Sequence, residues 1–399
     1  MKKYLKIILI FLFAVTGAYL ALTAGTVLTV HEQSVTALVG EEIQLPGYTA
    51  SLFSRDMNDA VSVADPTDKD HTGTYTVTYR LSWHGIPLRT VRIPVTVRDV
   101  DAPVIETDTG GVLFVKTGEP ADLSAFRVSD NYDAPENISL TVSGDYDLNT
   151  EGRYNVRITA ADTGGNTAEK HLVLAVGDIS ESDFAPGVFD LYAYDHSGVC
   201  FSGLAEPADD GMFDRIYFVG DSNFVNMAKY KAVNPQRVLA RHAMSPGTFD
   251  LPVIYGNVQT DRSALQIISE IQPEYCIVGM GLSEAGNRNP LVLADAYEQC
   301  MIRLQEACPD TTFVISSLFP VIKGQGKAPA SQTEINRINY CLMKMCERIH
   351  MNMIYNSEWL TDSEGYAEKD YFLNDGFHLK AGYFSIYTDC IRYTFHFPE

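Results

Sequence analysis

The first thirty residues contain an uncharged, apolar run that restricts what this chain can fold into. Three lysines lie among the first six residues, and the run extends from Ile7 to Val30. Crossing a bilayer takes roughly 20 apolar residues, so this run is long enough to span a membrane as a helix. The positive flank predicts a cytoplasmic N-terminus and an extracellular remainder. A cleaved signal peptide is the alternative, but Ala21-Leu22-Thr23 is a poor cleavage site, so we predict a cytoplasmic stub and transmembrane anchor over residues 1–30.

The length and charge of the chain limit its organisation and its partners. A chain of 399 residues is long enough for several domains. A formal net charge of −21 argues against a nucleic-acid partner, because phosphate binding needs a basic face. Neutral sugars and acyl groups would not be repelled, and an acidic surface also serves solubility alone. The seven cysteines are an odd number without paired short spacings, which argues against a disulfide framework. No Cys-x-x-Cys pair is present, which argues against a zinc or redox site.

Residues 31–178 show the alternation of polar and apolar residues that is typical of β-strands. They also contain an internal repeat. Val39-Gly40-Glu41 has its counterpart 78 residues later at Thr117-Gly118-Glu119, and Gly73-x-Tyr75 recurs 79 residues later as Gly152-x-Tyr154. Repeated units of this length with several short strands predict two all-β sandwiches. The two predicted modules cover residues 31–99 and 100–178.

A resemblance to a known module supports this division. Gly152–Val156, followed by Ala161–Asn166, resembles the bacterial Ig-like (HYR-like) modules of surface proteins, in which a Gly-x-Tyr strand leads to an Asp-x-x-Gly-Asn hairpin. The second module keeps this hairpin, and the first has Ser82–Gly85 in its place. The resemblance implies two Ig-like sandwiches that serve as spacers.

The second module contains a group of acidic residues that permits two interpretations. Asp130-Asn131-Tyr132-Asp133 could ligate calcium through its carboxylates. An Asx-rich turn explains the same residues without an ion. We favour the turn, and we expect neither a metal nor a cofactor.

From Phe213 onward, short apolar strands alternate with helical stretches, which predicts an α/β domain with a parallel sheet over residues 213–399. A polar connector is expected over residues 179–212. Ile216–Val219 is apolar throughout, as a buried central strand is, and Gly220-Asp221-Ser222 follows at once. A serine at such a turn projects its hydroxyl at the carboxyl edge of the sheet. Its N–H lies at a helix N-terminus, where an oxyanion is stabilised.

The serine needs a base, and the sequence has nine histidines. Asp375-Gly376-Phe377-His378 places a carboxylate three residues ahead of a histidine, a spacing that lets the carboxylate hold one ring nitrogen while the other faces the serine. Asp68 and His71 have the same spacing in a loop of the first β-module. Glu347 and His350 have it on an expected helix. Spacing alone therefore does not choose among the three.

The first and last blocks of the α/β domain resemble those of the SGNH/GDSL hydrolase family. That family opens with a strand, Gly-Asp-Ser and a helix, as at residues 216–222, and closes with an Asp-x-x-His block followed by Gly-Tyr, as in the Asp-x-x-His-x-x-x-Gly-Tyr of residues 375–383. The resemblance covers about residues 213–396 and implies a three-layer, flavodoxin-like α/β fold. It also implies that Ser222 is the nucleophile and His378 the base, with Asp375 orienting His378.

The implied oxyanion hole departs from the family pattern at two positions. Its donors are expected to be the N–H groups of Ser222 and Ala243, together with the Ser283 side chain. Ala243 stands where the family has glycine, a mild change if the local φ is negative. Ser283, in Gly281-Leu282-Ser283-Glu284, stands where the family has an asparagine amide. Losing such a donor costs roughly 100- to 1000-fold in turnover. Asn287 is an alternative donor if its loop folds back.

Together these features predict a membrane-anchored extracellular serine esterase or deacylase. The expected substrate is an O-acylated cell-wall or environmental glycan, or a small ester, and a transacylase differs only in the acceptor that replaces water. A catalytically degenerate SGNH domain that acts as a surface binding or adhesion module is the alternative, motivated by Ser283. A purely structural surface stalk is a third interpretation, and it predicts that Ser222 and His378 lie far apart.

Overall fold

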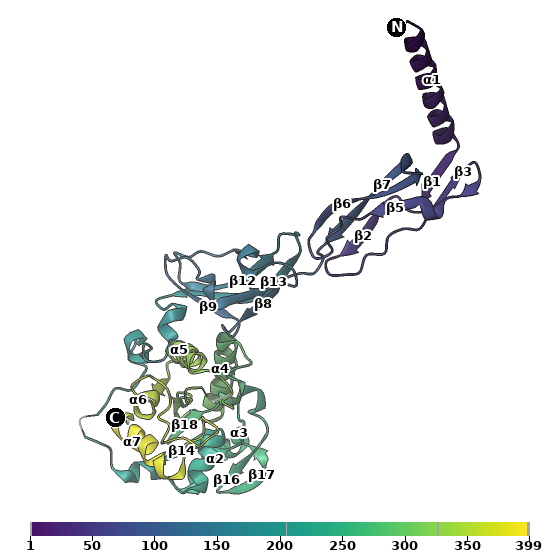
Figure 1. Ribbon diagram of the computed structural model, residues 1–399. Helices are drawn as coiled ribbons and strands as arrows, with labels where there is room; N and C mark the ends of the chain where they lie inside the picture. The colour runs from purple at the N-terminus through teal and green to yellow at the C-terminus, as the bar shows by residue number, and fades with distance from the viewer. Residues whose placement is uncertain (1, 205, 325–326, 397–399) are drawn as a thin grey trace. The chain divides into compact units, whose positions relative to one another are not determined.

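The computed structural model describes residues 2–204, 206–324 and 327–396 (Figure 1). The chain divides into two compact units. The unit boundary passes through the second predicted β-module, so each unit takes part of that module. The first unit comprises Met1–Ile105, Val128–Leu140 and Thr159–Ala168, and the second comprises Glu106–Arg127, Thr141–Ile158 and Glu169–Glu399.

The apolar run at the N-terminus forms a single helix, α1 (Lys2–Ala24). By length and composition α1 could cross a membrane, as could a signal sequence, and none of its residues is buried against protein. The helix ends earlier than the uncharged run does. Thr26–Val30 form strand β1, in which residues at alternate positions are buried, and β1 pairs antiparallel with β3 (Tyr48–Leu52). Gly25 and the β-branched residues that follow it favour this change from helix to strand.

Two sheets follow α1 in the first unit and enclose one core. The strands are β1, β2 (Val35–Leu38), β3, β4 (Arg55–Asp56), β5 (Val61–Ala64), β6 (Gly73–Trp83) and β7 (Ile86–Arg98). One sheet has the order β1-β3-β4 and the other β2-β7-β6-β5. Their inward-facing residues form one cluster: Leu28 and Ala50 from the first sheet, and Val77, Tyr79, Leu81, Ile93 and Val95 from the second. The predicted period of two thus places alternate side chains in a core.

The next six strands form two further sheets. The strands are β8 (Val104–Thr107), β9 (Val112–Lys116), β10 (Phe126–Ser129), β11 (Ser139–Ser143), β12 (Gly152–Ala161) and β13 (Thr167–Gly177). The larger sheet has the order β11-β12-β13-β9, and β10 pairs with β8. Strand β9 pairs parallel with β13, as β2 pairs parallel with β7 in the preceding region. Within each of the two predicted modules, an early strand thus pairs parallel with the last strand.

The remaining chain forms a seven-stranded sheet with helices on both faces. Its elements are β14 (Ile216–Gly220), α2 (Ser222–Lys229), β15 (Val238–Ala240), β16 (Pro252–Tyr255), β17 (Val258–Ser263), α3 (Ala264–Ile271), β18 (Tyr275–Gly279), α4 (Pro290–Ala307), β19 (Thr312–Ser316), α5 (Gln332–Ile349), β20 (Asn352–Ile354), α6 (Ser357–Leu360) and α7 (Phe384–Thr394). The strand order is β17-β16-β15-β14-β18-β19-β20. Strands β15, β14, β18, β19 and β20 are parallel, as predicted. The antiparallel hairpin β16–β17 at one edge was not predicted.

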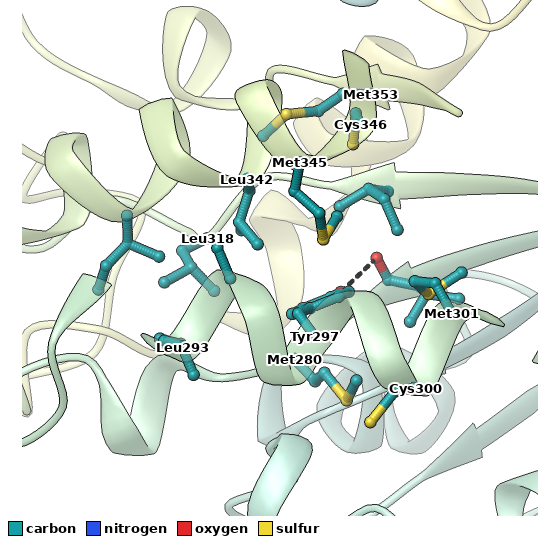
Figure 2. Close-up of a cluster of buried hydrophobic side chains, with 14 of the residues drawn as sticks. Met280, Leu293, Tyr297, Cys300, Met301, Leu318, Leu342, Met345, Cys346 and Met353 are labelled. Carbon is teal, nitrogen blue, oxygen red and sulfur yellow. Dashed lines mark hydrogen bonds between the residues drawn. The ribbon is translucent and has the colours of Figure 1, made fainter. Parts of the chain in front are cut away.

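Alternate residues of the parallel strands point into two separate cores. On one face, Val219 and Leu239 pack with helices α3, α4 and α5. On the other face, Phe218 and Val238 pack with helices α2 and α7. The sheet is therefore the middle of three layers. Figure 2 shows part of the first core, where Tyr297 of α4 donates a hydrogen bond to the carbonyl of Val278. Sulfur-containing side chains are part of this core, with Cys300 near Met280 and Cys346 near Met353.

The segment predicted as a polar connector packs against the α/β layers. Its described residues include the 3₁₀ helices Glu181–Phe184 and Leu191–Tyr194, and Phe184 and Leu191 are fully buried in the core formed with α4 and α5. Cys200 forms a parallel bridge with Met353 of β20. The segment's apolar residues are too widely spaced to give a periodic pattern, which is why its packing was not apparent from the sequence.

Candidate active site

Ser222 is the first residue of α2 and lies directly beyond the carboxyl end of β14. The chain passes from β14 to β15 on one side and returns on the other side as β18, so β14 lies where the strand order reverses. Open α/β sheets bind ligands at this reversal point. Asp221 caps α2, its Oδ1 accepting a hydrogen bond from the N–H of Asn223 at 3.0 Å. The fold thus presents the serine hydroxyl and the amino end of a helix at the same edge.

The strand-to-helix turn needs glycine at position 220, because its surroundings leave no room for a side chain. A Cβ at Gly220 would lie 2.3 Å from the carbonyl oxygen of Gly279 and 2.4 Å from the ring of Phe224. Gly220 and Gly279 are direct neighbours on β14 and β18. The close approach of the two backbones allows Phe224 to pack beneath the turn, which fixes the direction of the first turn of α2.

Three side chains from the predicted blocks meet at this turn. Ser222 Oγ lies 2.7 Å from His378 Nε2, and His378 Nδ1 lies 2.9 Å from Asp375 Oδ2. All three residues are partly buried. The distances are those of a hydrogen-bonded nucleophile, base and orienting carboxylate. They do not agree with the structural-stalk interpretation, which predicts a large separation between Ser222 and His378.

Asp375 is held by its own turn. Its Oδ1 accepts hydrogen bonds from the N–H groups of Phe377, at 3.2 Å, and His378, at 3.1 Å. Partial burial acts to raise the pKa of the Asp375 carboxyl, but these hydrogen bonds and the one from the His378 ring outweigh it, so the pKa lies below its ordinary value. The carboxylate therefore stays charged at neutral pH and keeps His378 Nδ1 as a hydrogen-bond donor.

Asn223 fastens the histidine loop to α2, a role that the sequence did not indicate. Its Nδ2 donates to the carbonyl of Phe377 at 3.2 Å, and its Oδ1 accepts from the N–H of Leu379 at 3.1 Å. These residues flank His378 on both sides, and Asn223 is only 2% exposed. A buried amide next to the nucleophile therefore sets the position of the base. The one sequence feature that could have indicated this role is that Asn223 is a polar residue directly after the serine, on the inner side of a helix whose other inward-facing residues are apolar.

Asp221 is buried beneath the site. Burial raises the pKa of its carboxyl to about 6, against the smaller lowering effects of the hydrogen bond from Asn223 and of the nearby His378 ring. A carboxylate in this position at neutral pH is a buried negative charge.

A cavity of about 300 Å³ opens over the nucleophile. It is large enough for a small acyl group together with part of its alcohol. Two basic side chains, His242 and Lys327, lie at its wall in a chain of strongly acidic composition. The complete lining is Asp221, Ser222, His242, Ala243, Leu282, Ser283, Lys327, Pro329, Phe377 and His378.

Ala243, the second predicted oxyanion donor, lines this cavity, but its backbone conformation is not the expected one. Its φ is +55°, in the left-handed region, whereas a negative φ was the condition under which alanine would be a mild replacement for glycine. The left-handed conformation costs an L-residue roughly 1–2 kcal/mol that glycine avoids. The N–H of Met244 bonds back to the carbonyl of Arg241 at 3.1 Å, so Ala243 is the third residue of a β-turn, the position at which type II turns have a positive φ. Alanine at this position is therefore strained.

Ser283 also lines the cavity, at the end of the loop that follows β18. Its hydroxyl donates a long hydrogen bond of 3.4 Å to the carbonyl of Ala243, which leaves it easily redirected. Asn287, the alternative donor, is exposed and is not part of the cavity wall.

The two other acid–histidine pairs do not belong to the site. His71 bonds to Asp68 at 2.9 Å with 70% of its side chain exposed, and His350 ends helix α5.

Comparisons with known proteins give matches among solved structures alone. No family model and no curated protein matches the chain. A GDSL-like lipase from Bacteroides thetaiotaomicron is 14% identical, over 50% of this chain and 93% of its own, with a TM-score of 0.35. A carbohydrate esterase family 3 protein from Talaromyces cellulolyticus is 12% identical, over 44% of this chain and 93% of its own, with a TM-score of 0.32. At these scores, what the site can do has to follow from its own geometry.

Proposed function

We propose that this chain is a serine esterase or deacylase of the SGNH/GDSL type, with Ser222 as nucleophile, His378 as base and Asp375 as the residue that orients His378. The observation that carries the proposal is the continuous hydrogen-bonded relay, 2.7 Å from Ser222 to His378 and 2.9 Å from His378 to Asp375. It lies at the reversal point of the sheet and opens into a cavity. Nucleophile, base and cavity are the three parts that acyl transfer requires.

In the acylation step, Ser222 Oγ attacks the carbonyl carbon of the ester while its proton passes to His378 Nε2. The carbonyl oxygen becomes an oxyanion, which the N–H groups of Ser222 and Ala243 bind together with the Ser283 hydroxyl. When the tetrahedral intermediate collapses, the bond to the alcohol oxygen breaks and His378 returns the proton to that oxygen. The alcohol leaves, and the acyl group remains on Ser222.

In the deacylation step, water replaces the alcohol. His378 removes its proton, the hydroxide oxygen attacks the acyl carbon, and Ser222 Oγ leaves with that proton. The carboxylic acid is released. If a sugar hydroxyl enters instead of water, the same steps transfer the acyl group to the sugar, so hydrolase and transacylase share the acyl-enzyme.

The proposed substrate is an O-acylated glycan of the cell wall or environment, or a small ester. Helix α1 supports an anchored or exported protein, with the two β-regions, proposed to be Ig-like, as spacers between membrane and enzyme. The net charge of −21 suits a neutral sugar better than an anionic polymer. The cavity volume of about 300 Å³ favours a short acyl chain.

A fluorophosphonate probe, which reacts with activated serines, tests the proposal on the full chain in detergent micelles. The wild type is expected to label, and Ser222→Ala is expected to lose the label. Ser269→Ala is a matched control, because Ser269 lies on α3, where its hydroxyl donates to the carbonyl of Gln266 at 3.0 Å, and it does not line the cavity. A folded wild type that does not label contradicts catalysis. Acetyl release from a panel of O-acetylated glycans then identifies the substrate.

One observation favours a second function, that of a degenerate domain that binds a ligand without turnover. Ser283 presents a hydroxyl where an amide donor is expected, and Ala243 holds a strained conformation beside it. A domain of this kind would bind the acylated glycan in the same cavity and release it unchanged. Retained glycan binding by a wild type that neither labels nor hydrolyses would establish this alternative.

A further inference from the structure

Four aspartates meet in the first compact unit, whereas Ser222 belongs to the second. Asp99 follows β7, Asp130 follows β10, Asp133 lies three residues further on, and Asp162 follows β12. Each provides a carboxylate oxygen, and these oxygens all lie within 4.8 Å of one another. Three separate loops are therefore needed to build the cluster. A chance group of surface carboxylates on a single loop does not have this construction.

The cluster is largely shielded from solvent. Asp99 is 9% exposed, and Asp133 and Asp162 are each 8% exposed. The chain thus holds like charges close together where water screens them poorly. Buried charges in proteins are ordinarily paired or bound to a metal.

Hydrogen bonds within the protein satisfy only part of the cluster. Asp133 accepts from the backbone and hydroxyl of Thr163, at 3.0 and 2.8 Å, and Asp162 accepts from the backbone and side chain of Asn166, both at 2.8 Å. Among the described residues, Asp99 Oδ2 and Asp130 Oδ1 are buried without any hydrogen-bond partner. Each therefore has an unused buried acceptor within the cluster.

We propose that this cluster is a calcium site, with Asp99, Asp130, Asp133 and Asp162 as its protein ligands. Calcium takes six to eight oxygen ligands in variable geometry, and backbone carbonyls or water complete such a set. The cluster offers oxygen only, whereas zinc prefers nitrogen and sulfur. Magnesium ordinarily uses one or two carboxylates and keeps its water, which does not suit four converging aspartates. Two unused oxygens and the excess negative charge both require a hard cation.

The site modifies the sequence-based expectation of an Asx turn without a metal. Asp130 does form that turn, since its Oδ2 accepts from the N–H groups of Tyr132, at 2.9 Å, and Asp133, at 3.0 Å. The turn uses one carboxylate oxygen and directs the other inward. Turn and ligand are therefore two functions of one side chain, and the sequence could not show this because Asp99 and Asp162 are distant in the chain.

Calcium titration of the full chain in detergent micelles, after treatment with EDTA, tests the proposal. Calorimetry is expected to give one site per chain, with a Kd on the order of 10⁻⁴–10⁻³ M, as extracellular calcium modules have. The melting temperature is expected to rise with calcium. Asp130→Asn keeps an oxygen acceptor for the turn but removes the charge, and is expected to weaken binding at least about tenfold. Asp99→Asn combined with it is expected to abolish binding.

The matched control is Asp147→Asn. Asp147 accepts from the N–H of Asn149 at 2.9 Å in a similar turn, but outside the cluster, so this variant should bind calcium as the wild type does.

The direction in which Asp130→Asn shifts the melting temperature distinguishes a calcium site from a purely structural hydrogen-bonded network. Without calcium, Asp130→Asn is expected to melt higher than the wild type, because one repelling charge is gone. With calcium it is expected to melt lower, because a ligand is gone. A variant that melts lower under both conditions indicates a hydrogen-bonded network only, and overturns the proposal. So does a folded wild type that shows neither binding heat nor a melting shift up to about 10 mM calcium, or binding that survives in the double variant.

Discussion

Asp375 and Asp130 begin turns with the same hydrogen bonds, yet the two turns do different things. In each, one carboxylate oxygen accepts from the N–H groups two and three residues later. The other oxygen of Asp375 holds the ring of His378 at 2.9 Å, whereas the other oxygen of Asp130 is buried with no hydrogen-bond partner in the part of the chain that the structure describes. The residue three positions on decides the outcome, because histidine supplies a donor and aspartate supplies a second acceptor.

The turn at Asp68 completes the comparison. It has the same spacing to His71 and the same 2.9 Å contact, but the pair is mostly exposed. An acid–histidine pair is thus a local product of the turn, and becomes a base only where the fold places a serine opposite its second nitrogen. The following predictions test this comparison.

The largest effect separates the two acid–histidine pairs. His378→Ala is expected to lower ester turnover by at least about 10⁴-fold, because Ser222 then has no base. His71→Ala, its matched control, should leave turnover unchanged. Initial rates on a chromogenic acetyl ester measure both. Equal losses in the two variants would show that the effect arises from stability rather than from chemistry.

The next effect separates the two aspartate turns. Asp375→Asn keeps an oxygen for the turn but loses the charge facing His378 Nδ1, and is expected to lower kcat by about 10³- to 10⁴-fold. Asp130→Asn should leave kcat at the wild-type value both in the presence and in the absence of calcium. Steady-state kinetics in EDTA and in calcium check this. A kcat that changes with the Asp130 substitution contradicts the proposal that the two aspartate turns have independent functions.

A smaller effect concerns the oxyanion donors. Ser283→Asn supplies the missing amide and is expected to raise kcat by about tenfold or more, whereas Ser283→Ala is expected to lower it. The Ser283 hydroxyl bonds only weakly to Ala243 at present, so the side chain is not needed there for the fold. Rates that stay equal in all three proteins would mean that Ser283 donates nothing to the oxyanion.

A pH-dependent effect concerns Asp221, whose carboxyl is buried like those of the calcium cluster. Its pKa rises from the ordinary 3.8 to about 6 on folding, so the folded state favours the protonated carboxyl. The stabilisation that results is fully present below about pH 4 and is lost as the pH rises through 6, because the buried carboxyl then becomes charged. Asp221→Asn removes that loss, and is expected to add up to about 3 kcal/mol to the free energy of unfolding at pH 7.5 and nothing near pH 4. Denaturant melts at both values measure it. A gain at pH 4 would contradict the assignment.

The smallest effect concerns backbone strain beside the serine. Ala243→Gly relieves the left-handed φ of +55° but adds freedom to the unfolded chain, so a net gain of about 0.5–1 kcal/mol is expected. Ala240→Gly, on the adjacent strand, should destabilise instead, because β15 holds Ala240 in an extended conformation within the core. Thermal melts of both proteins compare the two signs.

Much of the α/β region followed from the sequence because its signals are local. The apolar strand, the Gly-Asp-Ser turn and the Asp-x-x-His turn each lie within a few residues, and the structure brings Ser222, His378 and Asp375 into hydrogen-bond contact. The conformation of Ala243 did not follow, because φ at one residue depends on the whole turn after β15. Asn223 was missed because its partners lie more than 150 residues later.

The β-regions were predictable in a different way. Alternation and the repeat indicated the strands, and β6 and β7 bury alternate residues as expected. The aspartate cluster was only half visible, since Asp130 and Asp133 are neighbours in the chain while Asp99 and Asp162 come from other loops. Periodicity reports which face of a strand is buried, but it carries no information on which loops meet.

The fastening of the histidine loop by Asn223 has a consequence for when the proposed activity can arise during biosynthesis. Ser222 and Asn223 are made more than 150 residues before the loop that Asn223 holds, which contains the proposed base His378. Until that loop has been synthesised and has docked on Asn223, the Ser222 hydroxyl has no partner to accept its proton. Under the proposed function, acyl transfer therefore depends on a contact that forms late in synthesis.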